Sequence, residues 1–357
     1  MSTITINHVA ERAGVSITTV SRVINNEPSV RKKTQEKVLA AIKELDYQPN
    51  LSARNLGSAK SYVMAYAYDN PNTYYVTGMQ NGILEASREQ GYGLLIHPCD
   101  SSSEAINDEL RDLVRRSRIA GLILTPPLSE METVTETLQE LDVEFVRILS
   151  GEKLEGQAEN SIIVNDRKAA YDVTEYLIGL GHKHIAFFSG EEGHGSSTER
   201  LEGYKAALSN HNIPVNDALI VPGEYSYESG DMRARDLLSS STPVTAIFGC
   251  NDEIAAGALH AARLLNISVP DQLSIAGFED SPYSRQAWPK ITTAQQSNST
   301  ISHSAAELLI DKMRPQKSLP KKTRDAREDV TRKIGPDDRL YTPTLLVRDS
   351  TGPAPTI

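Results

Sequence analysis

Three side chains near the N-terminus, Ile17, Thr18 and Arg22, have the chemistry to contact the edges of DNA bases. An arginine guanidinium can bond O6 and N7 of guanine together, and an isoleucine can cover the methyl group of thymine. All three follow a break at Gly14 and Val15. This spacing places them in the first turns of one helix, where a base-reading helix makes its contacts.

The helices that must position these side chains are indicated by the surrounding hydrophobic residues. Val9, Ala10 and Ala13 fall on one helical face before the break, and Ser16 is placed to cap the helix that follows it. A third helix is expected over residues 32–45, with apolar residues at helical spacing that close a small core. The pattern predicts a small all-α head with helix-turn-helix spacing.

A further helical fragment follows this head. Pro49 and Asn50 are helix-start signals, but residues 51–56 are too few to form a stable helix alone in water. Something outside the fragment must therefore hold it.

The segments VAERAGVSITTVSRVIN and DYQPNLSARNL resemble the DNA-binding head of the lactose-repressor/galactose-repressor (LacI/GalR) family. The resemblance is dense over about sixty residues. It implies that residues 50–57 are a hinge helix that folds on DNA and that Leu56 wedges into a base step from the minor groove. The residues expected to contact a double-stranded DNA operator are Thr5, Ser16, Ile17, Thr18, Thr19, Ser21, Arg22, Asn25, Asn50, Ala53, Arg54 and Leu56.

From residue 61 onward, short apolar strands alternate with amphipathic helices, which is typical of a parallel sheet covered by helices on both faces. Strands are expected at 62–68, 93–97, 121–124 and 144–149, then in a second series at 161–164, 185–189, 246–249 and 273–277, with a final strand near 344–347. Helices are expected at 76–90, 104–117, 130–141, 167–180, 200–210, 229–239 and 253–265.

The two series predict an α/β core of two subdomains with a cleft between them. We expect a head over residues 1–60 and a core over 61–357, with one subdomain at about 61–160 and 294–320 and the other at about 161–291 and 321–348. Ligands of such sheets bind beyond the carboxyl ends of the strands. Tyr74, Tyr75 and Asp166 follow strands and are candidate lining residues.

The resemblance continues through the core in YLIGLGHKHIAFFSG, RLEGYKAAL, IFGCNDEIAAGAL, VPDQLSIAGFED and ITTAQQ, which look like the family's effector-binding core, similar to periplasmic sugar-binding proteins. The resemblance implies that Arg200, Asn251 and Glu279 grip the effector, that Tyr225 packs on it and that Gln296 is a further polar contact. Planar donors and acceptors beside an aromatic wall suit a sugar.

Some features depart from the family pattern. The family usually has aspartate where Glu279 stands, so Asp280 is an alternative carboxylate, and Gly151 occupies a position where the lactose repressor has a ligand-binding aspartate. Residues 316–339 form a charged stretch that we interpret as an exposed loop. The C-terminus carries no heptads, which favours a homodimer over a tetramer.

Charge and cysteine content narrow the class of protein. Residues 1–60 hold nine Lys/Arg and five Asp/Glu, whereas the remainder holds 28 and 42, so a basic head joins an acidic body. Cys99 and Cys250 are far apart and show no metal-ligand spacing, and His182 and His184 have no third ligand in view. With no leader and no membrane-spanning apolar run, we expect a cytoplasmic protein without metal or cofactor.

The remaining alternatives concern catalysis and the sign of regulation. The sequence holds no G-x-S-x-G elbow, no phosphate-cradling glycine loop and no recognisable pair of glycosidase carboxylates, which argues against an enzyme. We expect a repressor of carbohydrate-utilisation genes that a sugar inducer releases from a palindromic operator. A corepressor that tightens DNA binding remains the alternative.

Overall fold

The computed structural model describes residues 4–24, 30–47, 61–151, 158–314 and 339–356. The chain divides into two compact units, Met1–Tyr62 and Val63–Ile357. Each unit is described by itself.

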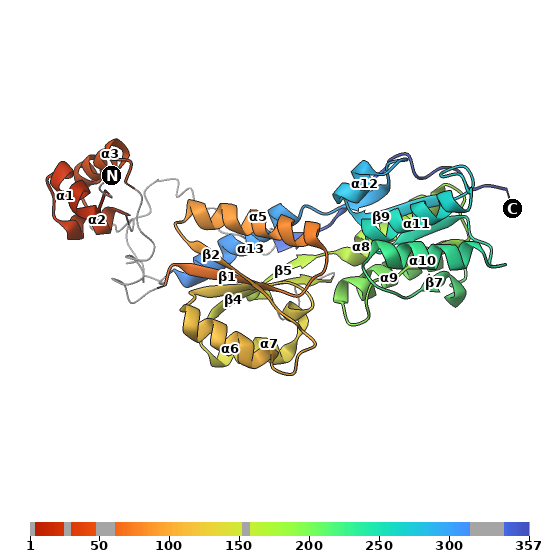
Figure 1. Cartoon of the computed structure of the whole chain (residues 1–357), viewed down its shortest axis with the longest axis horizontal. Coiled ribbons are helices and arrows are strands. Elements are labelled where there is room, and N and C mark those ends of the chain that lie inside the picture. The colour runs from red at the N-terminus through yellow and green to blue at the C-terminus, as the bar shows by residue number, and fades with distance from the viewer. Residues whose placement is uncertain (1–3, 25–29, 48–60, 152–157, 315–338, 357) are drawn as a thin grey trace. The chain divides into compact units, whose positions relative to one another are not determined.

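The first unit contains three helices, α1 (Ile6–Ala13), α2 (Ile17–Ile24) and α3 (Lys32–Glu44) (Figure 1). Gly14 ends α1 in the left-handed region at φ 64°, a conformation that favours glycine, and so turns the chain toward α2. The helices enclose a small core of Val9, Ala10, Val20, Val23, Val38 and Ala41. The all-α helix-turn-helix head predicted from the sequence is confirmed.

One lobe of the second unit is built on a six-stranded parallel sheet in the order β11-β5-β4-β3-β1-β2. Its strands are β1 (Val63–Tyr68), β2 (Gly93–Pro98), β3 (Gly121–Leu124), β4 (Glu144–Ser150), β5 (Ser161–Val164) and β11 (Leu340–Tyr341). Helices α5 (Thr73–Glu89) and α13 (Asn298–Met313) cover one face, and α6 (Ile106–Ser117) and α7 (Glu132–Glu140) cover the other (Figure 1). The short helices η1 (Leu128–Glu130) and η2 (Ala158–Asn160) lie beside β4.

The other lobe is built on a sheet in the order β12-β10-β9-β8-β6-β7, in which only β12 runs antiparallel to its neighbour. Its strands are β6 (Ile185–Phe188), β7 (Ile220–Val221), β8 (Ala246–Gly249), β9 (Ser274–Glu279), β10 (Thr292–Gln295) and β12 (Thr344–Leu346). Its helices are α8 (Asp166–Gly179), α9 (Gly195–Asn210), η3 (Asp217–Leu219), α10 (Tyr227–Leu238), α11 (Asp252–Leu264) and α12 (Pro282–Gln286). The pairs α8–α9 and α10–α11 pack against its apolar core (Figure 1).

The sheet topology corrects three expected assignments. β5 pairs with β4 in the first sheet, although its place in the chain predicted that it would join the second series. β10 pairs with β9 in the second sheet, so the return to the first lobe begins after Gln295 and not at residue 294. β11 pairs with β5 in the first sheet, inside the range expected to belong to the second lobe. The strands that the structure describes therefore place three crossings between the lobes, after β5, β10 and β11.

Helix ends also differ where they bear on the cleft. Helix α5 begins at Thr73 instead of residue 76, so Tyr74 and Tyr75 lie in its first turn. Helix α9 begins at Gly195 instead of residue 200, so Arg200 lies in its second turn.

Among the described residues, no helix is both long enough and apolar enough to cross a membrane.

Candidate functional sites

The helix α2 presents the side chains predicted to contact bases. Ile17 is 49% exposed, and Thr18 and Arg22 are exposed too. Ser16 caps α2, since its hydroxyl accepts a hydrogen bond from the Thr19 N–H at 3.2 Å and lies 2.9 Å from the Thr19 hydroxyl. Ser16 and Thr19 therefore stabilise the N-terminus of α2, and the side chains predicted to contact bases stay exposed to solvent.

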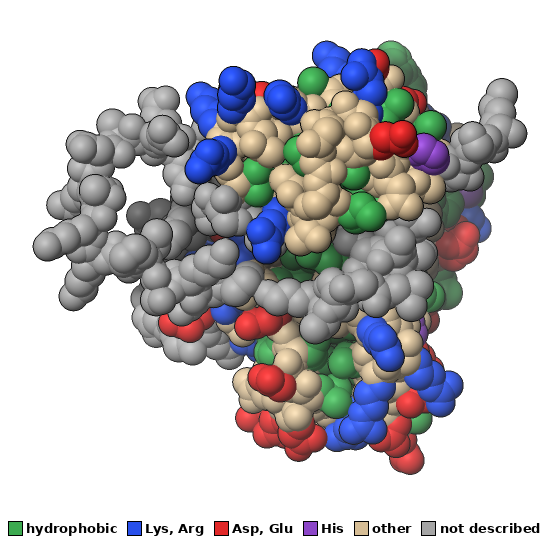
Figure 2. Space-filling model, turned by 90° about the vertical axis from the view of Figure 1, so that its left-hand side faces the viewer, with side chains coloured by type: hydrophobic (Ala, Val, Ile, Leu, Met, Phe, Trp, Pro, Cys, Tyr) green, Lys and Arg blue, Asp and Glu red, His purple; other side chains and the backbone are tan. Residues whose placement is uncertain are grey.

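The other residues of the predicted DNA contact set lie at different places. Thr5 precedes α1, where its N–H donates to Nδ1 of His8 at 3.0 Å, and Ser21 is half-buried on α2. The described Lys and Arg side chains of the helical head are all exposed, and Figure 2 shows Lys and Arg side chains at several places on the face turned to the viewer. Asn25, Asn50, Ala53, Arg54 and Leu56 lie outside the described residues, together with the expected hinge helix.

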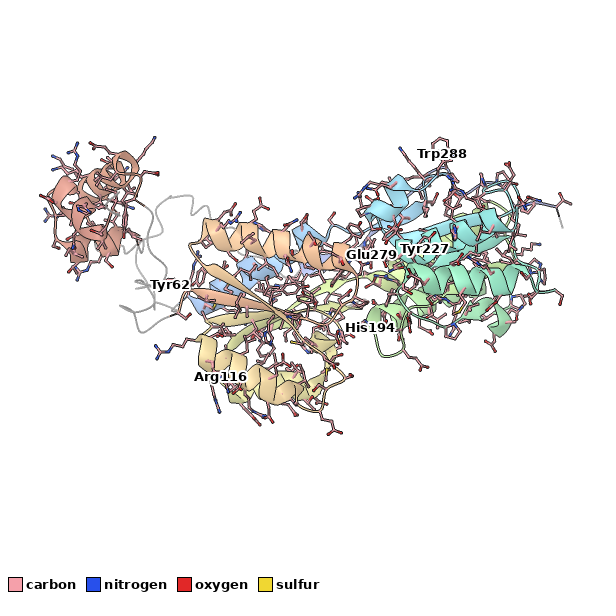
Figure 3. The ribbon with its side chains drawn as sticks, in the orientation of Figure 1. Tyr62, Arg116, His194, Tyr227, Glu279 and Trp288 are labelled. Carbon is pink, nitrogen blue, oxygen red and sulfur yellow. The ribbon has the colours of Figure 1, made fainter. Side chains whose placement is uncertain are left out.

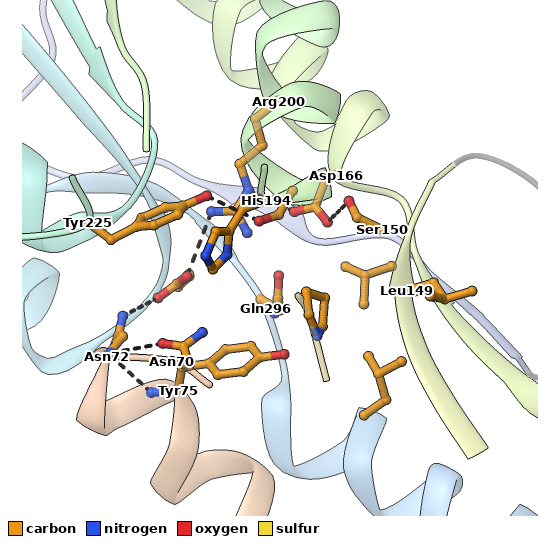
Figure 4. Close-up of a pocket in the computed structure, with 15 residues that line it drawn as sticks. Asn70, Asn72, Tyr75, Leu149, Ser150, Asp166, His194, Arg200, Tyr225 and Gln296 are labelled. Atoms are coloured by element: carbon orange, nitrogen blue, oxygen red, sulfur yellow. Dashed lines mark hydrogen bonds and ion pairs between the residues drawn. The ribbon is translucent and has the colours of Figure 1, made fainter. Parts of the chain in front are cut away.

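A cleft lies between the two lobes of the second unit, and both lobes line it (Figure 4). Its position at the carboxyl ends of parallel strands agrees with the rule for open sheets. The lining residues are Asn70, Asn72, Tyr75, Pro126, Ile148, Leu149, Ser150, Val164, Asp166, His194, Ser196, Arg200, Tyr225, Glu279 and Gln296.

A buried ion pair lies at the centre of this cleft. Asp166 starts α8 directly after β5, and Arg200 reaches it from α9, with Nε 2.7 Å from the Asp166 carboxylate. The same guanidinium donates to the Cys250 carbonyl at 2.6 Å and stacks 3.7 Å above the Phe278 ring. Ser150 donates to the second Asp166 oxygen at 2.5 Å from the other lobe. These contacts fix the orientation of the guanidinium before any ligand arrives.

Glu279 joins the two lobes beside this pair. Its carboxylate accepts a hydrogen bond from the Asn72 amide at 2.9 Å and lies 3.7 Å from Arg200. Asn72 also caps α5 by accepting from the N–H groups of Tyr74 and Tyr75. Burial raises the pKa of Glu279 to about 8, against the opposing effect of Arg200. Glu279 has φ 100°, a conformation that costs energy for a residue with a Cβ and is a common feature of functional sites.

Tyr225 forms the aromatic wall of the cleft. Its hydroxyl is 2.7 Å from the Ser197 hydroxyl and 3.1 Å from that of Ser196 at the start of α9. A Cβ at Gly190 would lie 2.2 Å from the Tyr225 ring, so glycine is required there for the ring to pack. The His194 ring meets the Tyr225 ring edge-on at 5.7 Å. Figure 3 shows His194 and Glu279 at the junction of the two lobes.

Gln296 is the lining residue whose polar atoms are least satisfied. Its Nε2 donates to Asn298 at 2.7 Å, but its buried Oε1 has no hydrogen-bond partner among the described residues. A buried acceptor without a partner costs free energy that a bound ligand can recover.

The structure brings together six of the nine predicted effector residues: Tyr75, Asp166, Arg200, Tyr225, Glu279 and Gln296. Tyr74 is not among the lining residues, since it is 44% exposed and packs edge-on against Tyr283. Asn251 is fully buried beneath the cleft, where its side chain caps α11 through the Ile254 N–H at 2.9 Å.

Asp280, the proposed alternative to Glu279, points elsewhere. Its carboxylate bonds Arg348 at 2.5 Å and Arg285 at 3.1 Å, and neither partner lines the cleft. Hydrogen bonds from Arg348 and Gln295 hold its pKa below the usual range despite partial burial. The structure therefore assigns the cleft position to Glu279 alone.

Asn70, one of the strand-following residues to which the strand-end rule points, also lines the cleft. Four polar lining residues were not predicted from the sequence: Asn72, Ser150, His194 and Ser196. Asn70 follows β1 and Ser150 ends β4, so the strand-end rule signals both. His194 and Ser196 lie at the start of α9, a helix whose true beginning the apolar pattern did not reveal.

The H-x-H pair does not mark a metal site. His182 is buried, with one ring nitrogen 3.0 Å from the Thr245 hydroxyl and the other 3.0 Å from the Ser274 hydroxyl and the Gly352 carbonyl. It is a hydrogen-bonded core histidine.

Comparisons with known proteins match both units. Residues 5–50 match the family described as bacterial regulatory proteins, lacI family, and residues 174–351 match a periplasmic binding protein-like domain. The probable HTH-type transcriptional repressor ExuR of Bacillus subtilis (strain 168) is 30% identical over 311 residues, covering 86% of this chain and 91% of that protein.

Two solved structures also cover nearly the whole chain. A lac repressor dimer bound to operator and the anti-inducer ONPF has a TM-score of 0.72 at 25% identity, covering 98% of this chain and 100% of that one. A complex of the transcriptional regulator CelR with cellobiose has a TM-score of 0.66 at 25% identity, covering 97% and 99%.

Proposed function

This chain belongs to the LacI family of bacterial regulatory proteins, and from that premise we propose that it is a repressor that a sugar releases from its operator. It is a DNA-binding transcriptional regulator and not an enzyme. The single observation that carries the proposal is the cleft in which buried polar groups of both lobes converge on one space. We propose that it acts in the cytoplasm, where operator DNA is present.

The chemistry of the cleft favours an uncharged polyhydroxy ligand. A guanidinium has five N–H donors, so Arg200 has donors beyond those bonded to Asp166 and Cys250. Gln296 offers an unpaired acceptor, and Tyr225 offers an aromatic wall. The charge of Arg200 is already balanced by the Asp166 carboxylate, so an anionic ligand meets no surplus positive charge. The similar regulator CelR is bound to a sugar, cellobiose, in its solved complex.

Hydrogen bonds across the cleft couple ligand binding to the relative orientation of the two lobes. Asn72 bonds Glu279 across the cleft, and the Gly195 N–H at the start of α9 donates to Glu130 of the other lobe at 3.0 Å. A ligand that replaces or reinforces these bonds changes the relative stability of two lobe orientations. The change in the free-energy difference between the two lobe orientations equals the difference in the ligand's binding free energy to them.

We propose that an aromatic surface links this movement to dimerisation. Tyr74 of the first lobe contacts Tyr283 of the second at 5.7 Å between ring centroids, and Tyr283 stacks on Tyr227 at 6.4 Å. Trp288, which points away from the lobes in Figure 3, is 75% exposed. We propose that two chains pair through their cores and present two heads to a palindromic operator. Residues 50–57 would then fold as paired hinge helices in the minor groove, with Leu56 as the wedge.

The site is tested by a pair of neighbouring variants, Gln296→Ala and Gln295→Ala. Gln295 is exposed and does not line the cleft, so it is a matched control. A thermal-shift screen of the full chain against mono- and disaccharides identifies the stabilising sugar. Titration of each variant with that sugar should show its Kd raised about 2- to 10-fold in Gln296→Ala, the cost of one neutral hydrogen bond, and unchanged in Gln295→Ala.

Equal affinity of the two variants would remove this cleft as the binding site. A screen in which no sugar stabilises the protein, while purine bases or other small molecules do, would favour the corepressor alternative.

A further inference from the structure

A second group of potential ligands lies in the first lobe, apart from the cleft. His97, Cys99 and Glu109 place one imidazole nitrogen, one thiol sulfur and one carboxylate oxygen within 4.8 Å of one another. None of the three lines the cleft. Within the part of the chain that the structure describes, this is the one such group of three.

The arrangement follows from the pleat of the strand. Residues two apart on a strand point to the same side, and His97 is two residues before Cys99, which follows the end of β2. Leu95 and Cys99 both pack against the apolar cluster beneath α6. Glu109 comes from the first turn of α6 and meets them there. Two ligands from a strand end and one from the facing helix thus converge.

The contact between His97 and Glu109 is not an ordinary hydrogen bond. The Nε2 atom lies 2.8 Å from the Glu109 Oε1 atom, yet this buried nitrogen makes no aligned hydrogen bond. Cys99 Sγ has only a weak contact at 3.7 Å with the His97 carbonyl. The donor atoms therefore lie close together without satisfying one another.

We propose that His97, Cys99 and Glu109 bind a zinc ion. Imidazole, thiolate and carboxylate are the ligands that zinc prefers, with bonds of roughly 2.0–2.3 Å. A tetrahedral zinc with such bonds holds its ligand atoms roughly 3.4–3.7 Å apart, so small side-chain rotations suffice to form the site. Three protein ligands leave the fourth position to water or a further ligand. The thiolate disfavours Mg²⁺ and Ca²⁺, which select oxygen ligands.

This assignment goes beyond the proposed function and does not depend on it. Cysteine spacing alone predicted no metal site, because Cys99 and Cys250 lie far apart in the sequence. The third ligand stands ten residues beyond Cys99, on another element, and only the fold brings it near.

The test is metal binding by the full chain, stripped of metal by chelation and kept reduced. Titration with ZnCl₂ should show one tight site per chain, and CoCl₂ should give the thiolate-to-cobalt charge-transfer absorption of a cysteine ligand. His97→Ala, Cys99→Ser and Glu109→Gln should each weaken zinc binding by more than about 100-fold, since even the loss of an outer partner costs 10- to 100-fold. Cys99→Ser should also abolish the cobalt–thiolate band.

His211→Ala is the matched control. His211 also lies near a glutamate, with its Nε2 3.4 Å from Glu175, but has no thiol beside it among the described residues. This variant should bind zinc as the unchanged protein does. Circular dichroism in the presence of chelator establishes whether each variant is folded. If His97→Ala does not fold, Glu109→Gln, which keeps the shape of the side chain, replaces it as the test of the site. A cobalt spectrum without the thiolate band, or zinc affinity that survives Cys99→Ser, would overturn the assignment.

Discussion

Removal of the Arg200 charge is the perturbation that the structure makes most informative. Arg200 is 3% exposed and its main partner, Asp166, is 2% exposed. Their charged atoms lie 2.7 Å apart, with Glu279 at 3.7 Å on the other side. Arg200→Met keeps much of the side-chain volume over Phe278 but leaves the buried Asp166 carboxylate without its cation.

The loss of folding stability expected in Arg200→Met can be estimated. Breaking a buried ion pair by removal of one partner destabilises a protein by about 3–5 kcal/mol, because the remaining charge stays buried. Asp166→Asn added to Arg200→Met removes that charge and keeps an acceptor for Ser150. We therefore expect the double variant to recover most of the loss, although Asp166→Asn alone destabilises the protein.

Urea denaturation of the four proteins at pH 7, followed by circular dichroism, measures the coupling energy. If the double variant is as unstable as the sum of the two single variants, the two side chains do not interact, and the account of the cleft centre is wrong.

Three further outcomes are expected. Ile17→Ala should weaken operator binding roughly five- to tenfold in an anisotropy titration, whereas Leu39→Ala, of similar exposure on α3, should not; equal effects would contradict base reading by α2. Glu279→Gln should flatten the fall in unfolding free energy between about pH 4.5 and 8, because the folded protein holds a proton there that the unfolded chain has released; an unchanged slope would show that Glu279 is already ionised. Glu130→Ala should lower sugar affinity by up to about tenfold in calorimetry, since it removes a carboxylate bond between the lobes, and unaltered affinity would show that this bond plays no part in closure.

Most helices and strands could be predicted because their apolar residues recur with the period of the element. The sheet that a strand joins could not be predicted in this way. All four residues of β5 are buried. A short run of apolar residues indicates a buried strand, but it does not reveal with which strand that strand pairs. The pairing of β5 with β4 and β11 is a long-range property of the chain.

The cleft residues were predictable to the extent that strand ends define the site. Tyr74 and Tyr75 show the limit, because α5 begins at Thr73 and successive helical side chains point about 100° apart. Tyr75 faces the cleft and Tyr74 faces Tyr283. Asn251 shows another limit of prediction from the sequence. Its side-chain oxygen caps a helix, and the sequence around it does not distinguish a capping asparagine from one that binds a ligand.

Operator release by the sugar that fills the cleft is the most direct test of the proposed function. The measurement is the affinity of the full chain for a palindromic operator, selected from random duplexes, at fixed salt with and without a saturating concentration of the stabilising sugar. The sugar should lower this affinity by at least about 100-fold, as a nearly complete switch between two states requires. An operator affinity that stays the same or rises when the sugar is bound would contradict release by an inducer.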